Sequence, residues 1–186
     1  MRKLAHEEIP RLSPEEMRDK EKHPIVVVLD NIRSVHNVGS ILRTCDAMLV
    51  EHVWVTGYTP RPSHPGIRKA ALGSERTVSW SEAETAADVV TGLRDQGFTI
   101  AALEITDRPT SIADVTQSSF PLALVVGNEL VGVSEMVMNR ADLALEIPQY
   151  GSKQSLNVAV AFGIAAAGLV ERYRLLDRTR DPAPGA

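Results

Sequence analysis

Ser155 and Asn157 are the polar residues of this chain that are best placed for chemistry. They stand directly before a segment rich in Ala, Gly, Val and Leu that extends to residue 171 and has the composition of a helix. The first N–H groups of a helix have no partner within it, and the helix dipole favours negative charge there. A polar ligand or a reacting oxygen atom can be held at such a point. An alanine-rich packing helix with an ordinary N-cap is the alternative, and the segment taken alone favours that interpretation.

Two further polar clusters follow apolar runs. Asn37 and Arg43 come after the run 25–29 and fall in the first two turns of a predicted helix. Glu129 lies in the glycine-bounded loop 127–132, which follows another apolar run. Open α/β sheets bind their ligands at the carboxyl ends of strands. We therefore expect the three clusters to converge on one site.

The elements that must position these residues alternate along the chain. The pattern predicts strands at 25–29, 52–57, 98–103, 121–126 and 142–147, and helices near 37–48, 81–96, 133–140 and 155–174. A capping signal at Ser13 predicts a short helix from Pro14 to about Lys22. The proline-rich segment 56–74 is interpreted as a loop that orders on substrate binding. This alternation predicts an α/β fold with a mostly parallel sheet and helices on both faces.

Composition restricts the class of protein. A chain of 186 residues buries a substantial core without disulfides or metal, and its single cysteine, Cys45, suits the reducing cytoplasm. No signal pattern is seen, and the longest apolar stretch, 158–170, is shorter than the roughly 20 residues that span a bilayer. The net charge of −4 argues against a strongly electrostatic nucleic-acid binder. Basic residues cluster near both termini and in 61–69, although a solvated surface is the default for most of them.

Two other kinds of site are set aside. The loop 127–132 lacks the second glycine of a dinucleotide-binding GxGxxG pattern. The five histidines are scattered and no cysteine pair completes a tetrahedral site, so we expect no metal centre.

Taken together, the three clusters resemble the motifs of the SpoU (TrmH-type) RNA ribose methyltransferases of the SPOUT superfamily. The resemblance covers residues 24 to 174 and keeps the family's order. It is carried by Asn37-x-Gly39-x-x-x-Arg43, by Gly127-Asn128-Glu129-x-x-Gly132, and by Ile147-Pro148 followed by Gly151 and Ser155-Leu156-Asn157.

The resemblance implies a C-terminal trefoil knot at about residues 121–174, which general rules of chain topology would not predict. It further implies that S-adenosylmethionine is held by the loops 127–132 and 147–156. The implied cofactor-binding residues are Leu103, Gly127, Gly132, Ile147 and Leu156, and Gly127 is expected to leave open the space that the cofactor needs.

It also implies a homodimer with the active site at the interface. The small-residue helix suits a two-fold contact that includes Ala166, and equally suits packing on its own sheet. Within the chain we expect an N-terminal extension at 1–23, the methyltransferase domain at 24–174 and a flexible tail at 175–186.

The implied catalytic residues are Arg43, Asn37, Glu129, Ser155 and Asn157. Methyl transfer to a ribose 2′-hydroxyl requires alignment and stabilisation of a developing alkoxide. Arginine keeps its proton in proteins, so we expect Arg43 to hold phosphate and alkoxide, with the general base left open. Asn37, Ser155 and Asn157 would position the reactants by hydrogen bonds.

Glu129 would pair with Arg43 or orient its loop. The sequence thus predicts a cytoplasmic, S-adenosylmethionine-dependent RNA 2′-O-methyltransferase that acts on tRNA or rRNA, without naming the nucleotide. A knotted RNA-binding or assembly factor without catalysis is the alternative.

Overall fold

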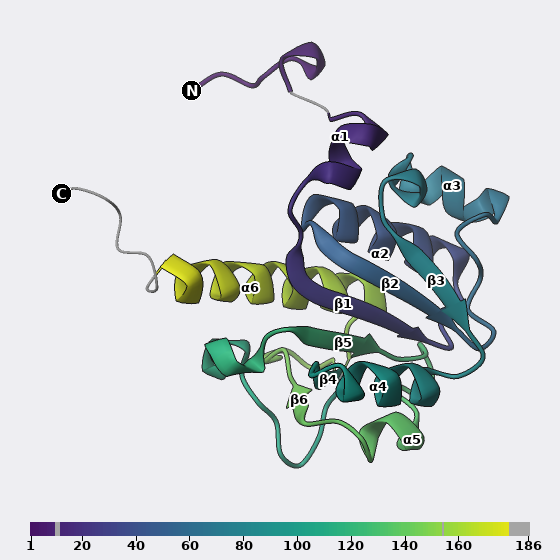
Figure 1. Ribbon diagram of the computed structural model, residues 1–186, viewed down its shortest axis with the longest axis vertical. Helices are drawn as coiled ribbons and strands as arrows, with labels where there is room; N and C mark the ends of the chain where they lie inside the picture. The colour runs from purple at the N-terminus through teal and green to yellow at the C-terminus, as the bar shows by residue number, and fades with distance from the viewer. Residues whose placement is uncertain (10–11, 154, 179–186) are drawn as a thin grey trace.

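The computed structural model describes residues 1–9, 12–153 and 155–178 (Figure 1). Its centre is a sheet of six parallel strands in the order β3-β2-β1-β5-β4-β6. The strands are β1 (His23–Asp30), β2 (Val50–Thr56), β3 (Trp80–Ala83), β4 (Thr99–Leu103), β5 (Leu122–Val126) and β6 (Leu143–Leu145). The predicted mostly parallel α/β fold is confirmed.

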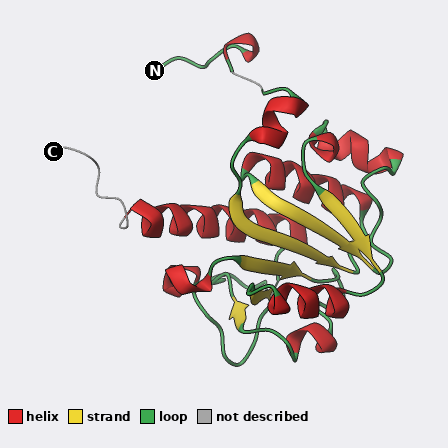
Figure 2. Ribbon diagram, in the orientation of Figure 1, coloured by secondary structure: helices red, strands yellow, loops and turns green. Residues whose placement is uncertain are grey.

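Helices cover both faces of the sheet (Figure 2). One face carries α2 (Val35–Ala47), α3 (Pro65–Ala71) and α6 (Val158–Arg178), and the other carries α4 (Ala86–Asp95) and α5 (Glu135–Met138). Strand β1 shows why: Val27 and Leu29 join the core under α2 and α6, while Val26 and Val28 join the core under α4. Since both faces of the strand are buried, its sequence is a continuous apolar run.

The helix starts follow from capping side chains. Ser13 forms a capping box with Glu16 at the start of α1 (Pro14–Asp19), which ends before the predicted Lys22. Ser34 caps α2 by accepting the N–H of Asn37. Asn37 therefore lies inside the helix, with its side chain free of the capping role. The described residues also contain four 3₁₀ turns: η1 (His6–Glu8), η2 (Ser74–Arg76), η3 (Ile112–Asp114) and η4 (Gln117–Ser119).

Two predictions about the middle of the chain are wrong. The segment 56–74 contains α3, because His64 caps it through Gly66 and Pro65 occupies the first turn, where its missing N–H costs nothing. The predicted helix 81–96 begins only at Ala86, since β3 precedes it and pairs with β2. Both errors arise because prolines and short strands give weak periodic signals.

The C-terminal helix α6 differs in its ends from the prediction of 155–174. It begins at Val158 and continues to Arg178, so the first residues of the predicted tail, 175–178, are helical. The rest of that tail, 179–186, lies outside the described residues. Within the described residues no helix combines the length and apolar character needed to cross a membrane.

Candidate active site

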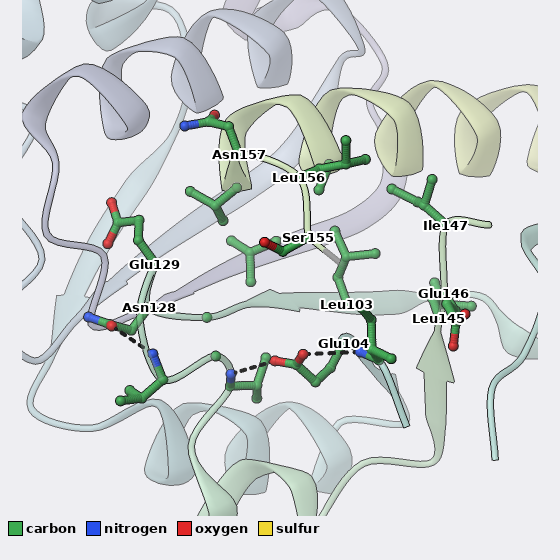
Figure 3. Close-up of a pocket in the computed structure, with 18 of the residues that line it drawn as sticks. Leu103, Glu104, Asn128, Glu129, Leu145, Glu146, Ile147, Ser155, Leu156 and Asn157 are labelled. Carbon is green, nitrogen blue, oxygen red and sulfur yellow. Dashed lines mark hydrogen bonds between the residues drawn. The ribbon is translucent and has the colours of Figure 1, made fainter. Parts of the chain in front are cut away.

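Two of the three polar clusters, the one around Glu129 and the one with Ser155 and Asn157, line one cavity of about 740 Å³ (Figure 3). Its walls come from the carboxyl ends of β4, β5 and β6 and from the residues that lead into α6. The lining residues are 103–105, 126–133, 145–147, 149, 155–158 and 161. All five residues expected to bind the cofactor lie in these walls, as do Glu129, Ser155 and Asn157. A parallel sheet brings together loops that are far apart in the sequence, which is why two separate motifs share one cavity.

Glu129 connects this cavity to helix α2. Its carboxylate accepts the N–H groups of Arg33 at 2.9 Å and Ser34 at 3.0 Å, and the side-chain amide of Asn37 at 2.7 Å. A carboxylate that accepts several N–H groups at a helix start is strongly held. Of the two roles expected for Glu129, the geometry matches orientation of the loop, because the carboxylate contacts the start of α2 instead of Arg43.

Asn157 extends the network to helix α6. Its Oδ1 accepts the N–H groups of Ala159 at 3.0 Å and Val160 at 3.3 Å, which makes Asn157 the cap of that helix. Its Nδ2 donates to Oδ1 of Asn37 at 3.1 Å. A single chain of hydrogen bonds therefore runs from the 127–132 loop through α2 to the start of α6.

Two polar residues that the sequence analysis missed shape the cavity wall. Asn128 is buried, and its Oδ1 accepts the N–H groups of Leu130 and Val131, so it folds the loop that carries Glu129. Glu104 follows β4 and accepts the N–H of Val133 at 3.0 Å. Both residues stand directly after an apolar strand, and the rule that located Glu129 would have found them as well.

The two glycines of the loop serve the loop itself. A Cβ atom on Gly127 would overlap the backbone of Gly132 and Val133. Gly132 has a φ of +72°, which favours glycine, and a Cβ atom there would overlap the Glu104 carboxylate. The sequence analysis expected glycine at 127 because a side chain would fill the space of the cofactor, and this reason is wrong. Glycine is needed there because two stretches of the loop backbone approach each other closely.

Arg43 lies apart from these groups. It is exposed on α2, and among the residues that the structure describes it is absent from the cavity lining. Helix α2, which carries Arg43, packs beside α6. The structure thus unites four of the five expected catalytic residues and leaves Arg43 outside the walls formed by one chain.

With this arrangement in view, the chain was compared with known proteins. Residues 24–167 match the model of the SpoU rRNA Methylase family. The chain belongs to the SpoU family. The match spans the three polar clusters and all the residues that line the cavity.

Several relatives within the SpoU family agree with this assignment. A tRNA (guanosine(18)-2′-O)-methyltransferase of Aquifex aeolicus is 33% identical over 150 residues, which are 80% of this chain and 70% of that protein. The crystal structure of the A. aeolicus TrmH/SpoU tRNA modifying enzyme has a TM-score of 0.78 and 28% identity, covering 92% of this chain and 86% of the other. An AdoMet-bound rRNA methyltransferase from Sinorhizobium meliloti has a TM-score of 0.75 and 28% identity, covering 87% of this chain and 61% of the other.

This SpoU chain is shorter than many of its relatives. It spans 58 to 65% of the length of several curated relatives that it matches. The activity and substrates of those longer proteins are therefore only proposed for this chain.

Acid should weaken the link that Glu129 makes in this SpoU chain. Partial burial by itself raises the pKa of the Glu129 carboxyl, but the hydrogen bonds it accepts, that from the Arg33 N–H first, outweigh burial and lower the pKa below its ordinary value. A carboxyl whose pKa is lowered on folding stabilises the fold above its unfolded pKa, and that contribution is lost as the pH falls through the folded pKa.

We therefore expect the melting temperature of Glu129→Gln to lie below that of the wild type at pH 7, with a gap that shrinks as the pH falls below about 4. Thermal melts from pH 7 to 3 measure this gap. Glu51→Gln, at an exposed carboxylate on β2, is the matched control and should show a smaller gap at pH 7. A Glu129→Gln gap of constant size across this range would contradict the assignment.

Proposed function

We propose that this protein is an S-adenosylmethionine-dependent RNA methyltransferase that methylates a ribose 2′-hydroxyl. The observation that carries the proposal is the joining of the three motif segments at one cavity by the bonds from Glu129 to Asn37 and from Asn37 to Asn157.

The cavity fits the expected cofactor in size and chemistry. Its volume of about 740 Å³ lies within the range of roughly 300–1,000 Å³ typical of small-molecule sites. Leu103, Ile147 and Leu156 supply apolar walls for an adenosyl group, and Asn128, Glu129 and Ser155 supply polar groups in the same lining. S-adenosylmethionine, when bound, supplies an electrophilic methyl group. Among the described residues no cluster of His, Cys, Asp or Glu is arranged to hold a metal ion.

The expected catalytic residues would have different roles in methyl transfer. Ser155 is exposed at the cavity wall, where its hydroxyl can bind the ribose or the cofactor. Asn37 donates to Glu129 and accepts from Asn157, and Asn157 caps α6, so both act as positioning residues. Arg43 would hold an RNA phosphate and stabilise the alkoxide, because its guanidinium donates in a planar fork and keeps its charge.

The proposed substrate is tRNA or rRNA, the classes named for the A. aeolicus and S. meliloti relatives, and such an enzyme would work in the cytoplasm. Ribose methylation should be mapped across tRNA and rRNA from cells with and without the protein, and the missing site restored in vitro by the purified protein. A protein that binds RNA and restores no methyl group would instead be an assembly factor.

We propose that the protein acts as a homodimer through the exposed face of α6. That face presents Val160, 52% exposed, and Ile164, 46% exposed, beside helix α2. Ala166, first considered for this contact, is 2% exposed and packs in the core of its own chain, so it cannot face a partner.

A glutamate at Ile164 should dissociate the dimer and lower methyl transfer together. A charge buried in an apolar contact without a partner costs several kcal/mol, on the order of 3–5. Light scattering and methyl transfer should be measured on the same sample. Met136→Glu, which places the same charge on the exposed, 58% accessible surface of α5 across the sheet, is the control. An Ile164→Glu monomer with wild-type activity would refute the requirement for a dimer.

The trefoil knot and the domain limits remain part of the proposal. Edge strand β6 lies beside β4, yet the helix that follows it returns across the sheet to pack against α2. Such a return past the β4 and β5 loops is what a knot within 121–174 requires. We further propose residues 24–174 as the catalytic unit and 1–23 as an extension. An experimental structure traced through 121–174 would test the knot.

A further inference from the structure

Tyr58, in the turn after β2, is an exposed aromatic residue that the proposed function has not used. The residue is 61% exposed. Its hydroxyl nevertheless accepts a hydrogen bond of 2.7 Å from Nδ2 of Asn128, and its N–H donates to Oδ1 of Asn31 at 3.3 Å. The hydroxyl of Tyr58 is hydrogen-bonded while the ring surface remains in water. The ring is therefore a fixed apolar platform on which a partner can pack.

The turn that carries Tyr58 is braced on both sides. Gly57 has a φ of +60°, and a Cβ atom there would overlap the Asn31 side chain, so the two segments are in close contact. Thr59 is buried; its Oγ1 accepts the N–H of Ile32 at 2.9 Å and donates to the carbonyl of Leu29 at 3.3 Å. The platform therefore rests on β1 and on the turn that leads into α2.

This platform stands beside the candidate active site. Asn128, which holds the Tyr58 hydroxyl, lines the cavity, and its neighbour Glu129 holds Asn37. The residues on either side of Tyr58, Gly57 and Thr59, line a second hollow of about 510 Å³, so there is open space next to the turn.

We propose that Tyr58 is the stacking platform for a base of the RNA substrate, at or next to the methylated nucleotide. The inference rests on the proposed function. A ribose in the active site carries a base that must leave its own stack, and splayed RNA bases are held against aromatic side chains. The hydroxyl bond to Asn128 fixes the ring relative to the cavity wall, so stacking sets the position of the ribose.

The test compares Tyr58→Leu with Tyr58→Phe and Tyr58→Trp. Loss of one stacked base weakens RNA binding by roughly 5- to 150-fold, which we expect for leucine. Phenylalanine and tryptophan keep an aromatic face and should remain near the wild type. Affinity for bulk tRNA and rRNA is measured by filter binding at several salt concentrations, with S-adenosylmethionine affinity and melting temperature measured in parallel.

The salt series separates stacking from charge. Tyr58→Leu should lower affinity equally at every salt concentration, whereas Arg33→Gln, in the adjacent turn, should reduce the salt slope by about one if it contacts phosphate. Wild-type affinity for Tyr58→Leu would overturn the proposal. An equal loss for leucine and phenylalanine, or a loss of cofactor binding, would assign Tyr58 to bracing the Asn128 loop and also overturn it. If the wild type binds RNA without transferring a methyl group, the proposed function fails, while the affinities still decide the role of Tyr58.

Discussion

Alanine at Arg43 is expected to slow methyl transfer by about 100- to 1,000-fold, the usual cost of losing one preorganised donor in a transition state. Affinity for S-adenosylmethionine should stay unchanged, because the exposed Arg43 side chain is not part of the cavity wall. Lysine should restore little activity, since a point charge does not reproduce the planar fork of a guanidinium. Single-turnover transfer with excess enzyme measures the rate, and titration calorimetry measures the affinity.

Arg140→Ala provides the matched control for Arg43. This arginine follows α5 and donates to the carbonyl of Met136, so its removal changes the net charge equally at a site on the opposite face of the sheet. We expect it to transfer methyl groups at nearly the wild-type rate. Wild-type transfer by Arg43→Ala, or full rescue by lysine, would refute the role assigned to the guanidinium.

Valine at Gly127 is expected to abolish cofactor binding and with it all methyl transfer. Its side chain would overlap the backbone of Gly132 and Val133, so the loop that forms one wall of the cavity must open. Calorimetry with S-adenosylmethionine measures the loss, and a thermal melt establishes that the variant is folded. Gly92→Val, in α4, adds the same atoms where no neighbour lies within 4 Å and should bind normally. Unchanged affinity in Gly127→Val would place the cofactor elsewhere.

The same two variants can locate Arg43 relative to the dimer. Because Arg43 is exposed and lies outside the cavity lining of its own chain, we expect it to serve the cavity of the partner. Mixing Arg43→Ala subunits with Gly127→Val subunits would then recover activity, since one cavity in each mixed dimer is intact and faces an intact arginine. If Arg43 serves its own cavity, every mixed dimer stays inactive.

The sequence predicted those features that depend on a strong local signal. The buried strands β1 and β5 are continuous apolar runs, and the polar residues after them fall where parallel sheets bind ligands. Strand β3 and helix α3 were missed, because β3 has four residues and forms only by pairing with β2, and prolines around α3 resemble a loop. Their formation depends on tertiary contacts, such as Gly39 of α2 against Ala70 of α3.

Side-chain partners and surfaces were the least predictable from sequence. The sequence allowed Glu129 to meet either Arg43 or its own loop, and only the path of the chain brings it to the start of α2. Ala166 was considered for a two-fold contact because small residues permit close approach of any neighbour. In the structure that neighbour is the chain's own core.

The bonds between Glu129, Asn37 and Asn157 have a fixed direction. A carboxylate only accepts, so Asn37 must turn its amide nitrogen toward Glu129 and its oxygen toward Asn157. Helix N–H groups only donate, so Asn157 must in turn present its oxygen to α6. The Glu129 carboxylate at one end and the first N–H groups of α6 at the other therefore fix the orientation of both side-chain amides. Aspartate at either position, though of the same size, would set two oxygen acceptors against each other and break the link between cavity and helices.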